Sequence, residues 1–262
     1  MLTGATRLVG LIGWPVSSSL SPRMQNAAFA ARGLDWAYVP LPVEESALEA
    51  AVRGLPALGF AGANVTVPYK AAVALLCDEI DAFAERAGSV NTIVVDGGRL
   101  LGSSSDGLAV ADAVEAEGKR VLILGAGGSA RAVGTALFDA GAELVAVAAR
   151  RAEAASALAE RLDALFPGRA VAGGPEAPDV VVNATPVRDE VQVELSGSET
   201  VVDLAYHADG TPTALVAAAR ERGCHVVDGL EILLLQGAAS FERWTGVPAP
   251  VDVMRAALTS RS

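Results

Sequence analysis

A glycine-rich turn follows the apolar run Val121–Leu124, and its spacing is the clearest chemical signal in the chain. Gly125, Gly127 and Ala130 fit the pattern G-x-G-x-x-[GA], directly after a predicted strand and at the start of a predicted helix. Gly125 permits a tight turn, Gly127 lets the backbone approach a pyrophosphate, and Ala130 allows close helix–strand packing. The helix N-terminus then offers N–H groups and a partial positive charge to phosphates. The turn predicts a dinucleotide site, whose phosphate-binding residues are Gly125, Ala126, Gly127, Gly128, Ser129 and Ala130. A strand-to-helix turn without a ligand is the alternative.

Two arginines, Arg150 and Arg151, follow the next predicted strand, Glu143–Ala148. A site that prefers NAD usually has Asp or Glu at this strand end, where the carboxylate binds the ribose 2′-hydroxyl. Guanidinium groups bind phosphate through paired hydrogen bonds instead. The arginines therefore favour the 2′-phosphate of NADP, and the alternative is that they only end a strand and face water.

Hydroxyl side chains cluster in the segment Ser17–Ser21, just before a predicted helix. We expect Ser21 to be the helix N-cap, with Pro22 at the first helical position. This structural role accounts for one serine and does not require Ser19. Ser19 is therefore a candidate for ligand binding.

A second polar segment, Gly62–Lys70, has polar groups at every second position of a predicted strand and ends in a lysine. The alternation places Asn64 and Thr66 on one face of that strand. Further polar residues lie in two short segments that each begin with a glycine, Gly88–Thr92 and Gly102–Gly107. Folding alone does not explain these three sets of residues.

The composition sets limits on the class of protein. The chain has 262 residues, of which 52% are hydrophobic and 5% aromatic, so aliphatic residues can fill the cores of two compact domains. The formal charge of −11 argues against a nucleic-acid partner, because phosphate backbones favour clustered cations.

The longest apolar runs, such as Ile232–Leu235, are too short to cross a bilayer. No basic-then-apolar leader opens the chain, which predicts a cytoplasmic protein. Cys77 and Cys224 are isolated, and we expect two buried free thiols, although a disulfide is possible. His207 and His225 are the only histidines, so metal and serine hydrolysis are disfavoured and no metal is expected.

Apolar runs alternate with alanine-rich helical stretches, which predicts an α/β fold of βαβ units with mainly parallel sheets. In the first part, the predicted strands are Leu8–Ile12, Ala37–Leu41, Gly62–Val67 and the hairpin Asn91–Val95 with Arg99–Gly102. The predicted helices there are Pro22–Arg32, Glu44–Leu58, Tyr69–Cys77 and Asp106–Glu117. In the second part, the predicted strands are Arg120–Leu124, Glu143–Ala148, Asp179–Asn183, Thr200–Leu204 and His225–Val227. The first predicted helix there follows the glycine turn and ends at Ala140. The other predicted helices are Ala152–Leu165, Thr213–Arg222, Leu230–Trp244 and Val251–Leu258.

Taken together, these segments resemble the shikimate dehydrogenase family. The family pattern S-x-S-P is similar to Ser19–Pro22, N-V-T-x-P-x-K to Asn64–Lys70, and G-A-G-G-x-[AS]-R to Gly125–Arg131. Further similar segments, colinear over nearly the whole chain, are Gly88–Thr92, Ser104–Gly107, Asn183–Thr185, Asp203–Tyr206, Asp228–Ala239 and Phe241–Gly246.

The resemblance implies two domains. Residues 1–104 plus 236–262 are expected to form a substrate domain with a mainly parallel sheet, to which the C-terminal helices return. Residues 105–235 are expected to form a Rossmann-like, doubly wound NADP-binding domain, with the substrate in the cleft between the two. The protein is expected to be a monomer or a homodimer, with a small-molecule substrate and no membrane partner.

The resemblance also implies the reversible reduction of 3-dehydroshikimate to shikimate by NADPH. Lys70 is expected to exchange the proton, and Asp106 to orient Lys70 and bind a ring hydroxyl. The implied substrate-binding residues are Ser19, Ser21, Asn64, Thr66, Asn91, Tyr206 and Gln236. Beyond the glycine turn, the implied cofactor-binding residues are Arg150, Arg151, Asn183, Thr185, Leu204 and Gly229. Without the surrounding pattern, Lys70 alone is typical of a solvated helix end.

The chain departs from the family pattern in three places. Ser17 and Ser18 precede Ser19, where the family often has a histidine, and Ser104 and Ser105 replace the N-T of N-T-D-G. The N-R-T motif is Ala149–Arg151 here. These departures leave open the same chemistry on quinate or an amino analogue, and a catalytically silent dinucleotide-binding protein.

Overall fold

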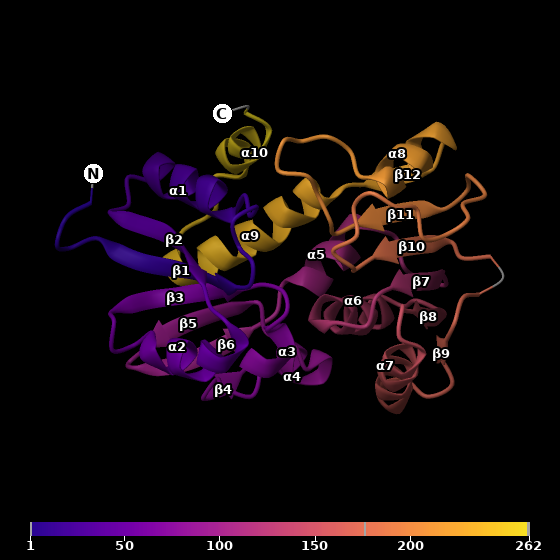
Figure 1. The fold of residues 1–262 in the computed structure, drawn as a ribbon, viewed down its shortest axis with the longest axis horizontal. Coiled ribbons are helices and arrows are strands. Elements are labelled where there is room, and N and C mark those ends of the chain that lie inside the picture. The colour runs from indigo at the N-terminus through magenta and orange to yellow at the C-terminus, as the bar shows by residue number, and fades with distance from the viewer. Residues whose placement is uncertain (1, 176, 261–262) are drawn as a thin grey trace. The chain divides into compact units, whose positions relative to one another are not determined.

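The structure, a computed structural model, describes residues 2–175 and 177–260 and divides into two compact units (Figure 1). The N-terminal unit comprises the residues up to Ser105 and those from Leu234 onward. The central unit comprises Asp106–Leu233. Each unit is built on its own six-stranded sheet, which confirms the predicted α/β fold class.

The sheet of the N-terminal unit has the strand order β2-β1-β3-β5-β6-β4. Its strands are β1 (Arg7–Gly13), β2 (Trp36–Pro42), β3 (Phe60–Val65), β4 (Glu79–Ile80), β5 (Thr92–Asp96) and β6 (Arg99–Ser103). β1 pairs in parallel with β2 and β3, whereas β5 pairs antiparallel with β3 and β6. The predicted hairpin is confirmed as β5 and β6. β3 is buried along nearly its whole length, as expected for a strand covered on both faces.

The helices of this unit are α1 (Ser21–Ala31), the 3₁₀ helix η1 (Glu45–Ala47), α2 (Leu48–Gly54), α3 (Lys70–Val73), α4 (Ala82–Ala87) and α10 (Val251–Thr259). The long helix α9 (Gly229–Thr245) begins in the residues of the central unit and ends in those of the N-terminal unit. Its Trp244 Nε1 donates to the carbonyl of Ile93 at 2.9 Å, and Arg23 on α1 donates to the carbonyl of Leu258 on α10 at 2.7 Å. These contacts confirm that the C-terminal helices return to the first part of the chain.

The central unit has an entirely parallel sheet with the strand order β9-β8-β7-β10-β11-β12. Its strands are β7 (Arg120–Leu124), β8 (Leu144–Ala148), β9 (Ala170–Ala172), β10 (Val180–Asn183), β11 (Thr200–Asp203) and β12 (His225–Val227). Its helices are α5 (Asp106–Ala113), α6 (Gly128–Asp139), α7 (Ala152–Leu165) and α8 (Ala214–Glu221). In chain order this is the 3-2-1-4-5-6 arrangement of the doubly wound nucleotide-binding fold, whose direction reverses between β7 and β10.

Three predicted helices are shorter than expected. The helix predicted at Glu44–Leu58 is η1 followed by α2, which ends at Gly54, two residues before Pro56, a residue without the N–H that would continue the helix. The helix predicted at Tyr69–Cys77 is regular only over Lys70–Val73, after which the chain continues in tight turns. The helix predicted at Asp106–Glu117 ends at Ala113. The short elements β4, α4 and β9 were not predicted.

The start of α1 corrects a second expectation. The N-cap residue is Leu20 rather than Ser21, which is already helical. Instead, the hydroxyl of Ser19 accepts a hydrogen bond from the backbone N–H of Ser21 at 3.2 Å. Ser19 therefore satisfies one N–H at the start of the helix, the role that the sequence had suggested for Ser21.

The two cysteines are free, as expected, but each is only partly buried, so the expectation of buried thiols is wrong. Burial raises the pKa of Cys77 to about 11, with the charge of Asp78 adding to the rise.

In residues 2–175 and 177–260, no helix is both long and apolar enough to span a membrane. Over the same residues, His, Cys, Asp and Glu form no group of three or more that could hold a metal ion.

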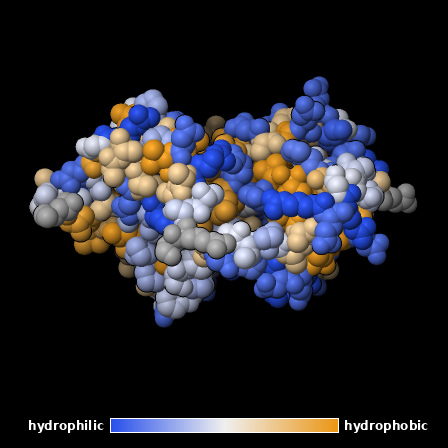
Figure 2. Space-filling view, turned by 90° about the horizontal axis from the view of Figure 1, so that it is seen from above, coloured by the Kyte–Doolittle hydropathy of each residue, from blue (hydrophilic) through white to orange (hydrophobic). Residues whose placement is uncertain are grey.

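On the face drawn in Figure 2, hydrophilic and hydrophobic residues are interspersed over both units. The larger apolar side chains that remain exposed include Leu2, Leu58, Leu75 and Val67, which lie in turns and loops outside the helices and strands. Scattered apolar residues of this kind are common on soluble proteins.

Candidate active site

The glycine turn lies at the carboxyl edge of the central sheet, where the strand order reverses. Gly125 directly follows β7 and has a φ of +115°, a backbone conformation that favours glycine. A Cβ at Gly125 would lie 3.1 Å from the carbonyl oxygen of Ala184, which follows β10. The turn after β7 therefore contacts the loop after β10, at the position where open α/β sheets bind ligands.

Gly127 is the N-cap residue of α6, and the protein's own packing does not explain why it is glycine. Its φ of −85° and ψ of −170° are extended backbone that any residue adopts. A Cβ built on Gly127 would have no atom within 4 Å. Because glycine has no side chain, the first turn of α6 has no side-chain cap and presents its backbone N–H groups there. A dinucleotide phosphate fits this position, since it needs both the N–H groups and the space.

Arg150 and Arg151 are both exposed and follow the end of β8. Arg151 is the N-cap residue of α7 and makes no side-chain cap. The strand adjacent to β7 thus ends in two solvent-facing cations, as a contact with the 2′-phosphate requires.

Asn183 and Thr185, predicted to bind the cofactor, form one hydrogen-bonded group at the end of β10. The side-chain oxygen Oδ1 of Asn183 accepts from the Thr185 hydroxyl at 2.7 Å, and the side-chain Nδ2 of Asn183 donates to the Asp203 carboxylate at 2.8 Å. Asp203, at the end of β11, also accepts from Thr213, the N-cap residue of α8. Burial raises the pKa of Asp203, and the hydrogen bonds from Thr213, Ala205 and Asn183 oppose that rise.

Tyr206 and Gly229, from two different predicted groups, line the same pocket of the central unit. The pocket lies between the loop after β11, α8 and the start of α9. Leu204 immediately follows β11, and its N–H donates to the Asn183 carbonyl at 2.9 Å. The ends of β10 and β11 are therefore joined by hydrogen bonds, and the loop after β10 lies next to the glycine turn.

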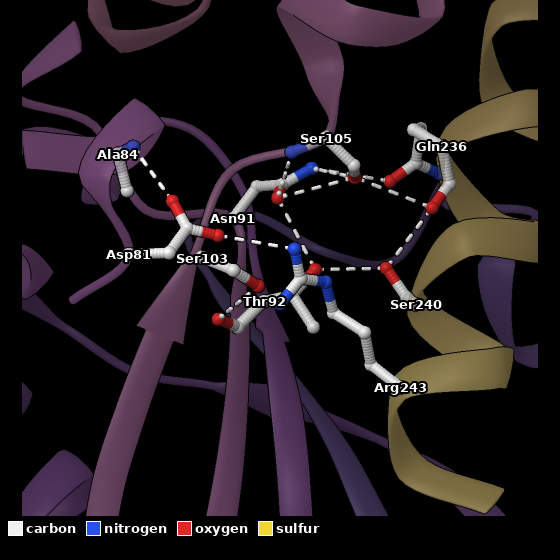
Figure 3. Close-up of polar contacts among 9 residues, drawn as sticks. All are labelled: Asp81, Ala84, Asn91, Thr92, Ser103, Ser105, Gln236, Ser240 and Arg243. Carbon is white, nitrogen blue, oxygen red and sulfur yellow. Dashed lines mark hydrogen bonds and ion pairs between the residues drawn. The ribbon is translucent and has the colours of Figure 1, made fainter. Parts of the chain in front are cut away.

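In the N-terminal unit, Asn91 is the centre of a polar network, shown in Figure 3. Its amide donates to the Ser105 hydroxyl at 2.9 Å and to Gln236 Oε1 at 3.4 Å. Its carbonyl oxygen accepts from the Ser105 N–H at 2.9 Å. Asn91 is only 1% exposed, so the bonds fix the amide orientation and hold the predicted residue Gln236 on α9 beside it.

Asn64, predicted to bind substrate, is buried and bonded within the protein. The side-chain oxygen Oδ1 of Asn64 accepts from the Tyr38 hydroxyl at 2.9 Å. Its side-chain Nδ2 donates to the backbone carbonyl of Asn91 at 3.0 Å and to the Ser240 hydroxyl at 2.9 Å. These contacts connect β2, β3 and α9. Asn64 thus supports the Asn91 network through the backbone of Asn91 itself.

Lys70 is partly exposed at the start of α3, and its carbonyl accepts from the N–H of Val90, which fixes the α3 backbone next to the Asn91 segment. Thr66, also partly exposed, follows β3 and packs against Gly13 so closely that a Cβ at Gly13 would overlap the Thr66 methyl group. Asp106 belongs to the central unit, where it begins α5, is 5% exposed and accepts from the Ser129 hydroxyl at 3.3 Å.

Two buried residues that bond to predicted site residues had not been singled out for a role in the sequence. Asp203 and Ser240 are both 0% exposed and hydrogen-bonded to predicted site residues. Their signal in the sequence is a single polar residue beside apolar neighbours: Asp203 follows Val201 and Val202, and Ser240 lies between Ala239 and Phe241. That signal is weak, because it does not identify the partner.

Comparison with known proteins gives three consecutive matches along the chain. Residues 11–93 match the shikimate dehydrogenase substrate binding domain, residues 108–205 match shikimate / quinate 5-dehydrogenase, and residues 229–259 match the shikimate 5′-dehydrogenase C-terminal domain. The shikimate dehydrogenase (NADP(+)) of Rubrobacter xylanophilus is 45% identical to this chain, over 98% of this chain and 97% of that protein.

Solved structures are similar over nearly the whole length. Shikimate 5-dehydrogenase from Thermus thermophilus, in complex with NADP(H) and shikimate, has a TM-score of 0.85 at 32% identity and covers 97% of this chain and 98% of its own. Quinate dehydrogenase from Corynebacterium glutamicum, in complex with NAD, has a TM-score of 0.86 at 31% identity and covers 98% of this chain and 99% of its own.

The fold and the site define a two-domain α/β protein with a Rossmann-like nucleotide-binding unit. The 45% identity to the Rubrobacter xylanophilus enzyme over nearly the whole chain shows the family to which the protein belongs. The chain belongs to the shikimate dehydrogenase family, as the sequence motifs had predicted.

Proposed function

We propose that this protein catalyses the reversible, NADP-dependent reduction of 3-dehydroshikimate to shikimate. The observation that carries the proposal is the near full-length similarity to the NADP(+) shikimate dehydrogenase of Rubrobacter xylanophilus. The glycine turn, with an uncapped helix and a glycine that folding does not require, supports a nucleotide in the central unit. Arg150 and Arg151 support the choice of NADP over NAD.

When bound, NADPH supplies the hydride that adds to the carbonyl carbon of the substrate. The Lys70 ammonium donates a proton to the carbonyl oxygen as negative charge develops there, and the new C–H and O–H bonds complete the alcohol. In the reverse direction, the Lys70 amine takes the hydroxyl proton. Asp106 accepts a hydrogen bond from a ring hydroxyl and so holds the ring in one orientation.

The remaining substrate contacts are assigned by chemistry. Asn91 and Gln236, already oriented by their mutual hydrogen bond, bind ring hydroxyls together with Thr66. Ser19, Ser21 and Tyr206 bind the substrate carboxylate with neutral O–H donors. Ser19 suits this role because its oxygen accepts from Ser21 N–H while its own O–H remains a donor. Asn64 acts through the Asn91 backbone.

The test is a spectrophotometric screen of shikimate and quinate, each with NADP⁺ and with NAD⁺, in the purified protein. We expect the highest kcat/KM with shikimate and NADP⁺. A higher value with quinate would transfer the assignment to quinate, an outcome that the similarity to a quinate dehydrogenase makes worth testing. Absence of nucleotide reduction with every pair would contradict the proposal and leave a silent nucleotide-binding protein.

We further propose the cytoplasm as the compartment and a monomer or homodimer as the active form. The two free thiols support a reducing compartment. Localisation of a tagged protein by fractionation and a light-scattering mass in solution test the two statements.

A further inference from the structure

The hydroxyl of Ser129 has a target that its place in the sequence does not suggest. Ser129 lies in the first turn of α6, one residue after Gly128, among the residues proposed to hold the pyrophosphate. Serine near a helix start usually caps that helix, but α6 has no side-chain cap. Ser129 Oγ instead donates across to α5, where Asp106 Oδ2 accepts at 3.3 Å.

The two helices that carry this pair are locked together. Gly107, next to Asp106, approaches α6 so closely that a Cβ there would lie 2.1 Å from the carbonyl oxygen of Ala132. The start of α5 therefore cannot shift along α6 without a collision of backbone atoms. Asp106 is 5% exposed, so a change in its hydrogen bonds is not masked by water.

We propose that Ser129 is a positioning residue for Asp106: its hydroxyl holds one carboxylate oxygen and so sets the rotation of the carboxylate that binds the substrate ring hydroxyl. The inference rests on the proposed function, because it takes the role of Asp106 from there. It adds that the helix assigned to the cofactor phosphates also orients a residue assigned to the substrate. The backbone N–H of Ser129 serves the phosphate, and its side chain serves Asp106.

The bond length sets the expected size of the effect. A distance of 3.3 Å is longer than the 2.5–2.7 Å typical of a hydroxyl on a carboxylate, so the bond orients the group more than it stabilises it. We expect Ser129→Ala to lower kcat with shikimate about three- to tenfold. The Kd for NADP⁺ is expected to change less than about threefold, because the backbone N–H groups remain.

The experiment is a double-mutant cycle with Ser129→Ala, Asp106→Asn and the combined variant, measured as kcat and KM for shikimate and as Kd for NADP⁺. If Ser129 acts through Asp106, Ser129→Ala lowers kcat in the wild-type background and changes it less than about twofold in the Asp106→Asn background. Ser129→Thr retains the hydroxyl and is expected to restore most of the activity. Thr135→Ala is the matched control, since the Thr135 hydroxyl on the same helix donates only to the carbonyl of Arg131.

Each outcome decides the matter. An equal loss of kcat in both backgrounds would overturn the inference, and so would a raised Kd for NADP⁺ with unchanged kcat, which would make the hydroxyl a cofactor contact only. A lower melting temperature with unchanged kcat, as expected for Thr135→Ala, would assign Ser129 to folding. A wild-type protein without turnover would instead contradict the proposed function itself, and this inference with it.

Discussion

The two units prepare for their proposed ligands in different ways. In the central unit the proposed nucleotide cradle is made of backbone: a turn at positive φ, a glycine N-cap and an uncapped helix end. In the N-terminal unit, the proposed substrate groups Asn91 and Gln236 are side chains that already bond to each other, and Ser105 bonds to Asn91 beside them. A phosphate needs N–H groups and space, whereas a polyhydroxylated ring needs donors and acceptors in fixed orientations.

This difference predicts which kinds of substitution each region tolerates without a loss of ligand binding or activity. A backbone cradle is sensitive to added volume and insensitive to most side chains. A network of buried side chains is sensitive to the loss of any one member, because the partner keeps an unpaired polar atom. The predictions below use this contrast, from the largest expected change in activity to the smallest.

Lys70→Ala is expected to lower kcat with shikimate by about 10²–10⁴-fold, the usual contribution of a positioned proton donor. Lys70→Arg keeps the charge but holds its proton too tightly to exchange it, so its kcat is expected to be almost as low. Steady-state kinetics together with a calorimetric Kd for NADP⁺ checks both. Lys119→Ala removes the same charge from the central unit and serves as the control. Near-normal kcat in Lys70→Ala would contradict the role of Lys70 as the proton donor.

Replacing both Arg150 and Arg151 by Ala is expected to weaken NADPH binding about tenfold to a hundredfold, and NADH binding far less. The cause is the loss of charged contacts with the 2′-phosphate, which NADH lacks. Fluorescence titration of both nucleotides measures the ratio. Arg53→Ala with Arg99→Ala removes the same net charge from exposed ion pairs of the N-terminal unit and controls for bulk charge. Equal losses for the two nucleotides would show that Arg150 and Arg151 do not recognise the phosphate.

Ser19→Ala is expected to raise the KM for shikimate several-fold and leave the Kd for NADP⁺ unchanged. The variant also loses the acceptor for the Ser21 N–H, which costs about 1 kcal/mol of stability. Ser18→Ala, an exposed neighbour, is the control for both readouts. A lower melting temperature with an unchanged KM would leave Ser19 with its structural role alone.

Glu199→Gln is expected to leave kcat unchanged and to lower stability at neutral pH. Burial of Glu199 disfavours its charge, but the N–H groups of Ser196 and Gly197 outweigh this and hold its pKa at about 2, below its ordinary value of 4.5. A depressed folded-state pKa stabilises the protein above about pH 4.5, and this stabilisation is lost as the pH falls toward 2. The difference in unfolding free energy between the variant and the wild type, about 3 kcal/mol at pH 7, should therefore shrink over that range in denaturant titrations. A difference that does not depend on pH would contradict this account.

The contrast between the units also explains what could be predicted from the sequence. The glycine turn, the strand before it and the parallel sheet were predictable because a few adjacent residues encode them. The Asn91 network was not, because Asn91 and Gln236 are 145 residues apart and only the folded chain brings them together. The sequence predicted that the Ser21 hydroxyl accepts an N–H bond at the start of α1, whereas the Ser19 hydroxyl does so. Either hydroxyl is suited to this role, and only the local backbone geometry decides between them. The short strands β4 and β9 escaped prediction because two or three residues carry no periodicity, whereas the equally short β12 was predicted at its two adjacent β-branched valines.

The measurement that tests the backbone cradle most directly is the Kd for NADP⁺ of Gly127→Ala, beside its melting temperature. The extended backbone and the empty surroundings of Gly127 predict a loss of less than about 1 kcal/mol in folding stability. If a pyrophosphate lies where the new methyl group would stand, the Kd rises at least about tenfold. Gly54→Ala, also open and in the N-terminal unit, is expected to leave the Kd unchanged. A folded Gly127→Ala variant that binds NADP⁺ as tightly as the wild type would contradict the account.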